Sequence, residues 1–120
     1  MLLAAKIFIV LVIAIHLYIL VLEMFLWTTR GPKVFKSFSR DLFEPTKSMA
    51  ANQGLYNGFL AAGLIWALMI SDPDWQKNVA LFFLGCVLVA GLYGAATVER
   101  RIFFVQSVPA LLGIAAILLS

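Results

Sequence analysis

Two ionisable side chains stand inside a long apolar stretch near the start of the chain. His16 and Glu23 are seven residues apart, so a helix places them on one face about two turns from each other. An imidazole and a carboxyl group are common partners in proton transfer, and both are costly to place in lipid. We therefore take both as candidate catalytic or ligand-binding residues. The alternative for His16 is a structural role, in which it donates to a backbone carbonyl.

Further polar side chains are spaced so that they reach the depth of Glu23. They are Asn52, Tyr56, Asn57, Tyr93, Arg100 and Gln106. If the apolar stretches are antiparallel helices, these residues gather in one half of the bundle, and the other half is almost purely apolar. We expect a polar pocket open to one side, with Glu23 at its centre and His16 at its floor. In the alternative, Glu23 pairs with Arg100 or Arg101, and the amide side chains only join neighbouring helices.

The elements that must position these residues are four apolar runs. We predict membrane-spanning helices over residues 7–27, 50–70, 79–97 and 102–119, because about 20 apolar residues cross a bilayer core. The composition agrees, with 63% hydrophobic residues, 12% charged residues and a mean hydropathy of +1.01. Soluble domains carry roughly 25% charged residues. The sequence therefore predicts one all-α transmembrane four-helix bundle over residues 1–120 and disfavours a water-soluble enzyme or a nucleic-acid-binding module.

The charged residues predict the orientation of this bundle. The chain has 9 Lys and Arg residues against 6 Asp and Glu residues, and the cations gather in the first and third connections. Both connections lie on one side of a four-helix array, and basic connections stay in the cytoplasm. We therefore predict cytoplasmic basic connections and both chain termini on the outer side.

The first connection interleaves phenylalanines with cations. Phe35, Phe38 and Leu42 fall at helical spacing, so the segment could form an apolar stripe in the lipid headgroup region. The alternative is an ordinary basic loop next to the membrane.

Small residues recur at four-residue intervals and predict where the helices touch. The series are Gly54-xxx-Gly58-xxx-Ala62, Ala90-xxx-Gly94 and Pro109-xxx-Gly113. Helices in lipid associate through such close backbone approach, and we expect these seams to be used inside the chain. Pro109 removes a backbone donor, so a local distortion is expected before it.

Several chemistries find no support in the sequence. One His and one Cys are too few for an ordinary zinc or haem site, so we expect no metal and no cofactor. Neither a glycine-rich phosphate loop nor a nucleophile elbow is present.

The polar positions together form a recognisable pattern. They are His16-x-Tyr18-x(4)-Glu23-Met24-x-x-Trp27, the block Asn52-Gln53-Gly54-Leu55-Tyr56-Asn57-Gly58, then Gly91-x-Tyr93-Gly94 and Gln106-x-x-Pro109-Ala110. This pattern resembles the bacterial membrane family known as domain of unknown function 1304. The resemblance implies a small four-helix protein of the bacterial cytoplasmic (inner) membrane, with several passes, and it implies no activity.

Three functions remain open at this point. The first is binding or transport of a small lipophilic or cationic molecule, with the bilayer as the other partner. The second is an intramembrane enzyme in which His16 and Glu23 transfer protons on a lipophilic substrate. The third is a structural subunit of a membrane complex. We expect no nucleic-acid partner, and self-association into a homo-oligomer is left open.

Overall fold

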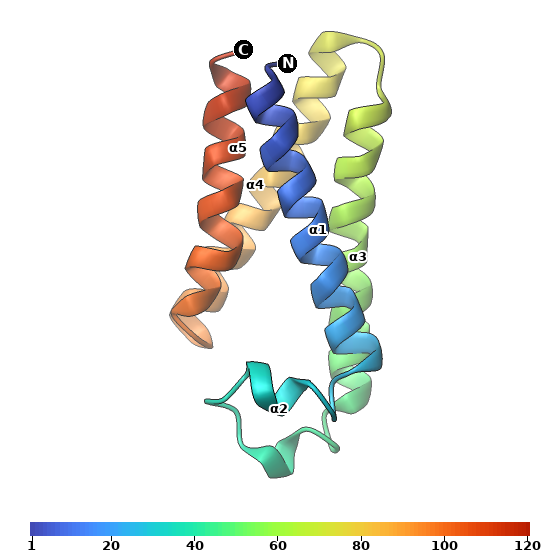
Figure 1. Ribbon diagram of the computed structural model, residues 1–120, viewed down its shortest axis with the longest axis vertical. Coiled ribbons are helices and arrows are strands. Elements are labelled where there is room, and N and C mark those ends of the chain that lie inside the picture. The colour runs from blue at the N-terminus through green and yellow to red at the C-terminus, as the bar shows by residue number, and fades with distance from the viewer.

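The computed structural model describes all residues from 1 to 120, and its regular elements are all helices, without strands (Figure 1). The long helices are α1 (Leu3–Phe25), α3 (Lys47–Met69), α4 (Pro73–Thr97) and α5 (Val108–Leu118). A π-helical turn, Phe103–Ser107, leads directly into α5. The connection between α1 and α3 contains the short helix α2 (Gly31–Val34) and a 3-10 turn (Arg40–Leu42).

The long helices form a bundle in which α1 touches α3 and α5, and α4 touches the same two helices. The molecule measures 48 × 24 × 18 Å along its principal axes. Both termini and the α3–α4 connection lie at one end, and the connection with α2 lies at the other (Figure 1). We call the latter the basic end, because it carries the connection between residues 26 and 46.

Two of the helices, α1 and α4, are long and apolar enough to cross a membrane. The segment Phe103–Leu118 is also apolar but shorter, and α3 begins with several polar residues. The predicted helical fold is therefore confirmed. The four-span topology and its orientation stay predictions.

Three helices, α1, α3 and α4, begin earlier than the apolar runs suggested. The clearest case is α4, which begins at Pro73 rather than at residue 79. The carboxylate of Asp72 accepts hydrogen bonds from the backbone N–H groups of Asp74 and Trp75, at 2.9 and 3.1 Å, and so caps the helix. Pro73 occupies the first turn, where its missing donor costs nothing. The local capping sequence, and not hydropathy, sets this boundary.

The core is apolar and lies toward the end with the termini. Thirteen buried residues form it, all of them hydrophobic, including Ile9 and Val12 of α1, Leu64 of α3 and Leu84 of α4. The buried polar residues, in contrast, are His16, Asn57 and Ser107. The molecule therefore has an apolar half and a half in which polar side chains enter the interior.

Glycines set the approach of the helices, although not every predicted seam is correct. A Cβ on Gly58 would lie 2.6 Å from Leu20 Cδ1, so α3 packs closely on α1. Gly63, in turn, lies under the ring of Phe83 on α4. Ala62 and Ala90 are exposed, so the prediction that they form part of the seams is wrong. The helix rotation places their immediate neighbours, Ala61 and Gly91, in the contacts instead.

The distortion predicted before Pro109 is present as the π-helical turn. The N–H of Val108 bonds to the carbonyl of Phe103, five residues earlier. A π turn widens the helix by one residue and re-aims the side chains that follow. Here it places both Gln106 and Ser107 opposite Gly91 of α4, where a Cβ would lie only 2.8 Å from the backbone N of Ser107.

The first connection folds around Trp27 and does not form an amphipathic helix. The rings of Phe35, Phe38 and Phe43 lie 5.5, 6.0 and 4.9 Å from the Trp27 ring, measured between centroids. The indole N–H of Trp27 donates to the hydroxyl of Thr46 at 3.0 Å and ties the two ends of the connection together. The predicted stripe facing the headgroups is therefore wrong for the phenylalanines, which pack inward.

Candidate functional site

Glu23 contacts a neutral amide from the neighbouring helix. The side-chain amide of Asn57 donates to Glu23 Oε1 at 2.6 Å. This contact depends on Gly54, where a Cβ would lie 3.0 Å from Glu23 Cβ, so only glycine lets α3 come this close. Asn57 follows Gly54 by three residues and shares its face. The sequence block around Asn57 thus both opens the space and supplies the donor.

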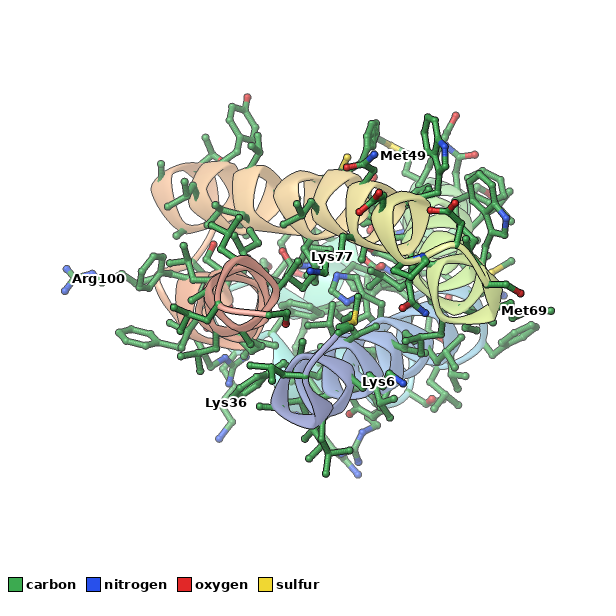
Figure 2. All side chains as sticks on the ribbon, turned by 90° about the horizontal axis from the view of Figure 1, so that it is seen from above. Lys6, Lys36, Met49, Met69, Lys77 and Arg100 are labelled. Carbon is green, nitrogen blue, oxygen red and sulfur yellow. The ribbon has the colours of Figure 1, made fainter.

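Glu23 has no cationic partner. The single ion pair in the structure joins Arg101 to Glu99 at 3.4 Å, at the turn after α4. Arg101 also donates from Nη2 to the backbone carbonyl of Val34, and Arg100 points away from the bundle (Figure 2). Glu23 Oε2 has no hydrogen-bond partner and is not enclosed by protein atoms. The predicted alternative, an ion pair between Glu23 and Arg100 or Arg101, is not formed.

His16 is fully buried, and both ring nitrogens have neighbours. Nδ1 lies 2.8 Å from the carbonyl of Val12, and Nε2 lies 3.5 Å from Nε2 of Gln106. A carbonyl can only accept, so Nδ1 carries the hydrogen in this arrangement. The neutral ring then accepts at Nε2 from the Gln106 amide. His16 therefore joins α1 to the π-helical turn.

Ser107 is the buried polar residue that the sequence analysis did not place at the site. Its hydroxyl donates to the backbone carbonyl of Leu88 on α4 at 3.1 Å. The signal for it was Pro109, two residues later, because the π turn before that proline directs Ser107 inward. Its role is to join the π-helical turn to α4.

Four of the eight predicted site residues lie elsewhere. The exposed fraction is 55% for Tyr56 and 72% for Tyr93, and Asn52 and Arg100 are also exposed. The prediction placed them by depth alone, but their positions around each helix axis turn them away from the interior. The arrangement thus contains two separate pairs, Glu23 with Asn57 and His16 with Gln106, and no single cluster.

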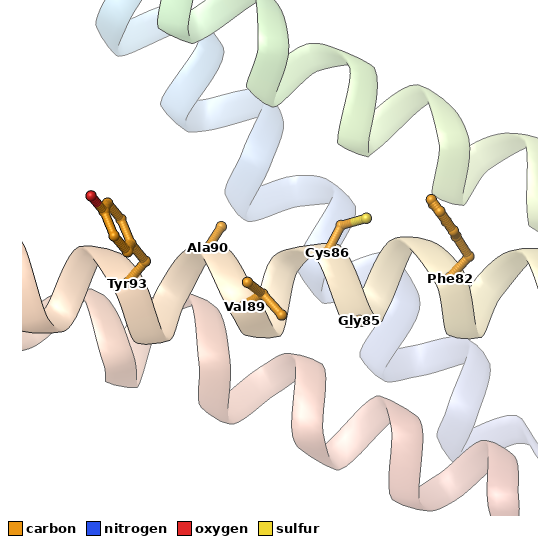
Figure 3. A pocket seen from close by; sticks show the side chains of 6 residues that line it. All are labelled: Phe82, Gly85, Cys86, Val89, Ala90 and Tyr93. Atoms are coloured by element: carbon orange, nitrogen blue, oxygen red, sulfur yellow. The ribbon is translucent and has the colours of Figure 1, made fainter.

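The main grooves of the molecule also lie elsewhere. The larger, of about 710 Å³, follows the outer face of α4 from Phe82 past Gly85 and Cys86 to Tyr93 (Figure 3). The second, of about 320 Å³, lies near Trp66 and Trp75. Both are lined almost entirely by apolar side chains, and neither includes Glu23 or His16. Nor does the structure contain a group of three or more His, Cys, Asp or Glu side chains that could hold a metal ion.

Comparison with known proteins now adds the family. Residues 10–118 match the family described as "Protein of unknown function (DUF1304)". The chain belongs to this family. The matched segment contains both polar pairs, from His16 to Gln106.

A curated relative also has no assigned function. The chain is 29% identical to "Uncharacterized protein YpaA" of Lactococcus lactis subsp. lactis (strain IL1403) over 99 residues, which cover 81% of this chain and 82% of that protein. No solved structure matches the chain. The description of the relative assigns it no activity, so the functional argument depends on the contacts themselves.

Proposed function

We propose that this chain is an integral membrane protein of four spans that binds a small lipophilic cation at Glu23 and transports it by exchange against protons. The observation that carries the proposal is the state of the Glu23 carboxylate, which has one neutral amide donor and no cation. An unpaired carboxylate within a span is costly and usually marks a substrate or proton pathway. A cationic ligand or a proton would each compensate its charge.

The position of Glu23 along α1 supports entry of the ligand from the basic end of the bundle. It lies two residues before Phe25, the last residue of α1, at the basic end of the bundle. The apolar core occupies the opposite half. A ligand would therefore enter from the basic end, which the charge distribution assigns to the cytoplasm. Access from the other side would require the apolar half to open, as in alternating access.

The two alternatives have weaker support. Acid–base catalysis would need His16 near Glu23, but seven residues of helix separate them by about 10 Å along the axis. Both ring nitrogens of His16 also have protein neighbours, and the side chain is fully buried. A role as a complex subunit has the apolar groove on α4 as its support.

Binding of tetraphenylphosphonium to the purified protein in detergent tests the proposal. We expect saturable binding by the wild type and at least about a tenfold weaker affinity for Glu23→Gln, since one charge pair in low dielectric is lost. The glutamine side chain can still accept from Asn57, so the fold is expected to persist. Circular dichroism melting curves check this point.

The matched control is Glu44→Gln, which removes an exposed carboxylate from the same end of the bundle. We expect this variant to bind as the wild type does. Vesicle uptake of the same cation, driven by a proton gradient and abolished in Glu23→Gln, would establish the transport step. Equal binding by the wild type and Glu23→Gln would make Glu23 a structural residue and overturn the proposal.

A further inference from the structure

An arginine at the basic end lies back along the outer surface of α1. This residue is Arg30, and its Nε donates a hydrogen bond to the hydroxyl of Tyr18 at 2.6 Å. The guanidinium carbon of Arg30 lies 5.7 Å from the centre of the Tyr18 ring. Both side chains are exposed. Two separate contacts therefore hold the guanidinium in place, while much of it stays open to the surroundings.

Most hydrogen-bond donors of this pair remain unused. A guanidinium carries five N–H groups, and only Nε–H of Arg30 has a partner in the protein. Arg30 forms no ion pair, because the single ion pair is between Arg101 and Glu99. The hydroxyl of Tyr18, which accepts from Arg30, retains its own hydrogen to donate. Such a set of donors around one positive charge matches the oxygens of a phosphate group.

The pair faces the lipid about two turns before the end of α1, if the chain spans the membrane as proposed. With 23 residues, α1 is about 34 Å long, slightly more than the hydrocarbon thickness of about 30 Å, so only its end reaches the headgroup region. Tyr18 precedes the last residue, Phe25, by about 10 Å of helix, and Arg30 follows the helix end and extends back to it. An exposed guanidinium at this depth is costly unless lipid phosphates move inward to it by local thinning of the bilayer.

The surroundings of the pair attract anions. Further exposed cations of the same end have no ion-pair partner: Lys33, Lys36, Arg40, Lys47 and Arg100. In the connections of this end, only Asp41, Glu44 and Glu99 oppose them, and Glu23 lies within α1. Basic residues next to a membrane concentrate anionic lipids at the surface.

We propose that Arg30 and Tyr18 form a binding site for the phosphodiester group of an anionic phospholipid. Arg30 binds two phosphate oxygens through its free N–H groups, and Tyr18 orients the guanidinium and donates its hydroxyl hydrogen. The other cations raise the local concentration of the lipid without fixing its position. The site rests on the proposed membrane placement and is independent of ligand binding at Glu23.

Native mass spectrometry of the detergent-purified protein tests the site. The probe is an equimolar mixture of dioleoyl-phosphatidylglycerol and dioleoyl-phosphatidylcholine. We expect the wild type to retain mainly the anionic lipid. Arg30→Lys keeps the charge but loses the planar fork, and we expect about a tenfold smaller anionic adduct, the size of one charge-assisted hydrogen bond. Tyr18→Phe, which keeps the ring, is expected to lose part of the adduct.

The control is Lys36→Gln, which removes a whole charge from the same end without touching the pair. We expect this variant to keep the anionic adduct. A wild-type adduct in Arg30→Lys, or an equal loss in Lys36→Gln, would reduce the effect to diffuse attraction and overturn the proposal. Displacement of the lipid by millimolar inorganic phosphate would also overturn it, because the site would then take the free anion.

Two further measurements separate this site from the proposed function. Glu23→Gln is expected to keep the lipid adduct, so failure of ligand binding at Glu23 would leave the lipid result intact. Recovery of the protein in the membrane fraction of cells tests the placement that both proposals share. A protein found only in the soluble fraction would overturn the lipid site as well.

Discussion

At the scale of single residues, the polar side chains of the interior act in pairs across helices. Asn57 gives its amide hydrogen to Glu23, and Gln106 lies against the Nε2 of His16. Each pair joins α1 to a different neighbour, so α1 is fixed by polar contacts at two depths. Removing Asn57 leaves the Glu23 carboxylate without a hydrogen bond within the protein, and this cost exceeds the loss of the bond alone. His16, in contrast, would keep its bond to the carbonyl of Val12.

The contact between Asn57 and Glu23 leads to a stability prediction. We expect Asn57→Ala to lower the free energy of unfolding by about 1–2 kcal/mol, because the carboxylate loses its only donor. Thermal unfolding in detergent micelles, followed by circular dichroism, measures the change. Asn52→Ala is the matched control, since Asn52 is exposed on the same helix. Equal effects of the two substitutions would show that the contact adds nothing to stability.

At the scale of elements, glycines determine how closely the helices approach. Gly54 and Gly58 bring α3 onto α1, and Gly91 brings α4 onto the π-helical turn. Gly85 differs from these, because a Cβ added there would meet nothing within 4 Å. It lies in the groove on the outer face of α4 (Figure 3). The contacts of a glycine, and not its presence in a helix, determine what a substitution costs.

Gly91 and Gly85 therefore form a matched pair for substitution. We expect Gly91→Ala to destabilise the fold by about 1–3 kcal/mol, because the added methyl group would meet the backbone N of Ser107 at 2.8 Å. Gly85→Ala is expected to leave stability unchanged or slightly higher, since alanine favours the helix. Melting temperatures of the two variants test this. A Gly91→Ala protein as stable as the wild type would show that the π-helical turn can move away freely.

At the scale of the whole molecule, most of the basic residues lie at one end of the bundle. The basic end carries the connection folded around Trp27 and the turn with Arg100 and Arg101, and the opposite end carries both termini (Figure 1). The backbone carbonyl of Val34 accepts from Arg101, so the two basic segments touch. The orientation proposed from the sequence, with the basic end in the cytoplasm, requires these two segments to lie at the same end.

Cysteine labelling in cells tests this orientation. In a Cys86→Ser background, we expect Ser71→Cys to react with a membrane-impermeant maleimide in intact bacterial cells. Ser37→Cys, in the basic connection, is expected to react only after the cells are lysed. Both positions are exposed, so accessibility within the protein does not separate them. Labelling of Ser37→Cys in intact cells would reverse the predicted orientation.

The sequence by itself determined the helical class and the division into an apolar and a polar half. Hydropathy and the intervals between polar residues carry this information, because both depend only on how far a residue lies along a helix. They also singled out His16, Glu23, Asn57 and Gln106, which the structure places in contacts within the bundle.

Only the tertiary structure decided which polar residues meet. Tyr93 and Tyr56 lie at suitable depths but are exposed, because contact depends on the rotation of each helix about its axis. Close packing at Gly54 and Gly91 sets that rotation, and hydropathy does not record it. The contact between Arg30 and Tyr18 likewise depends on how the connection folds around Trp27. The depth of a residue follows from its position along its own helix, whereas a site forms only where several helices pack together.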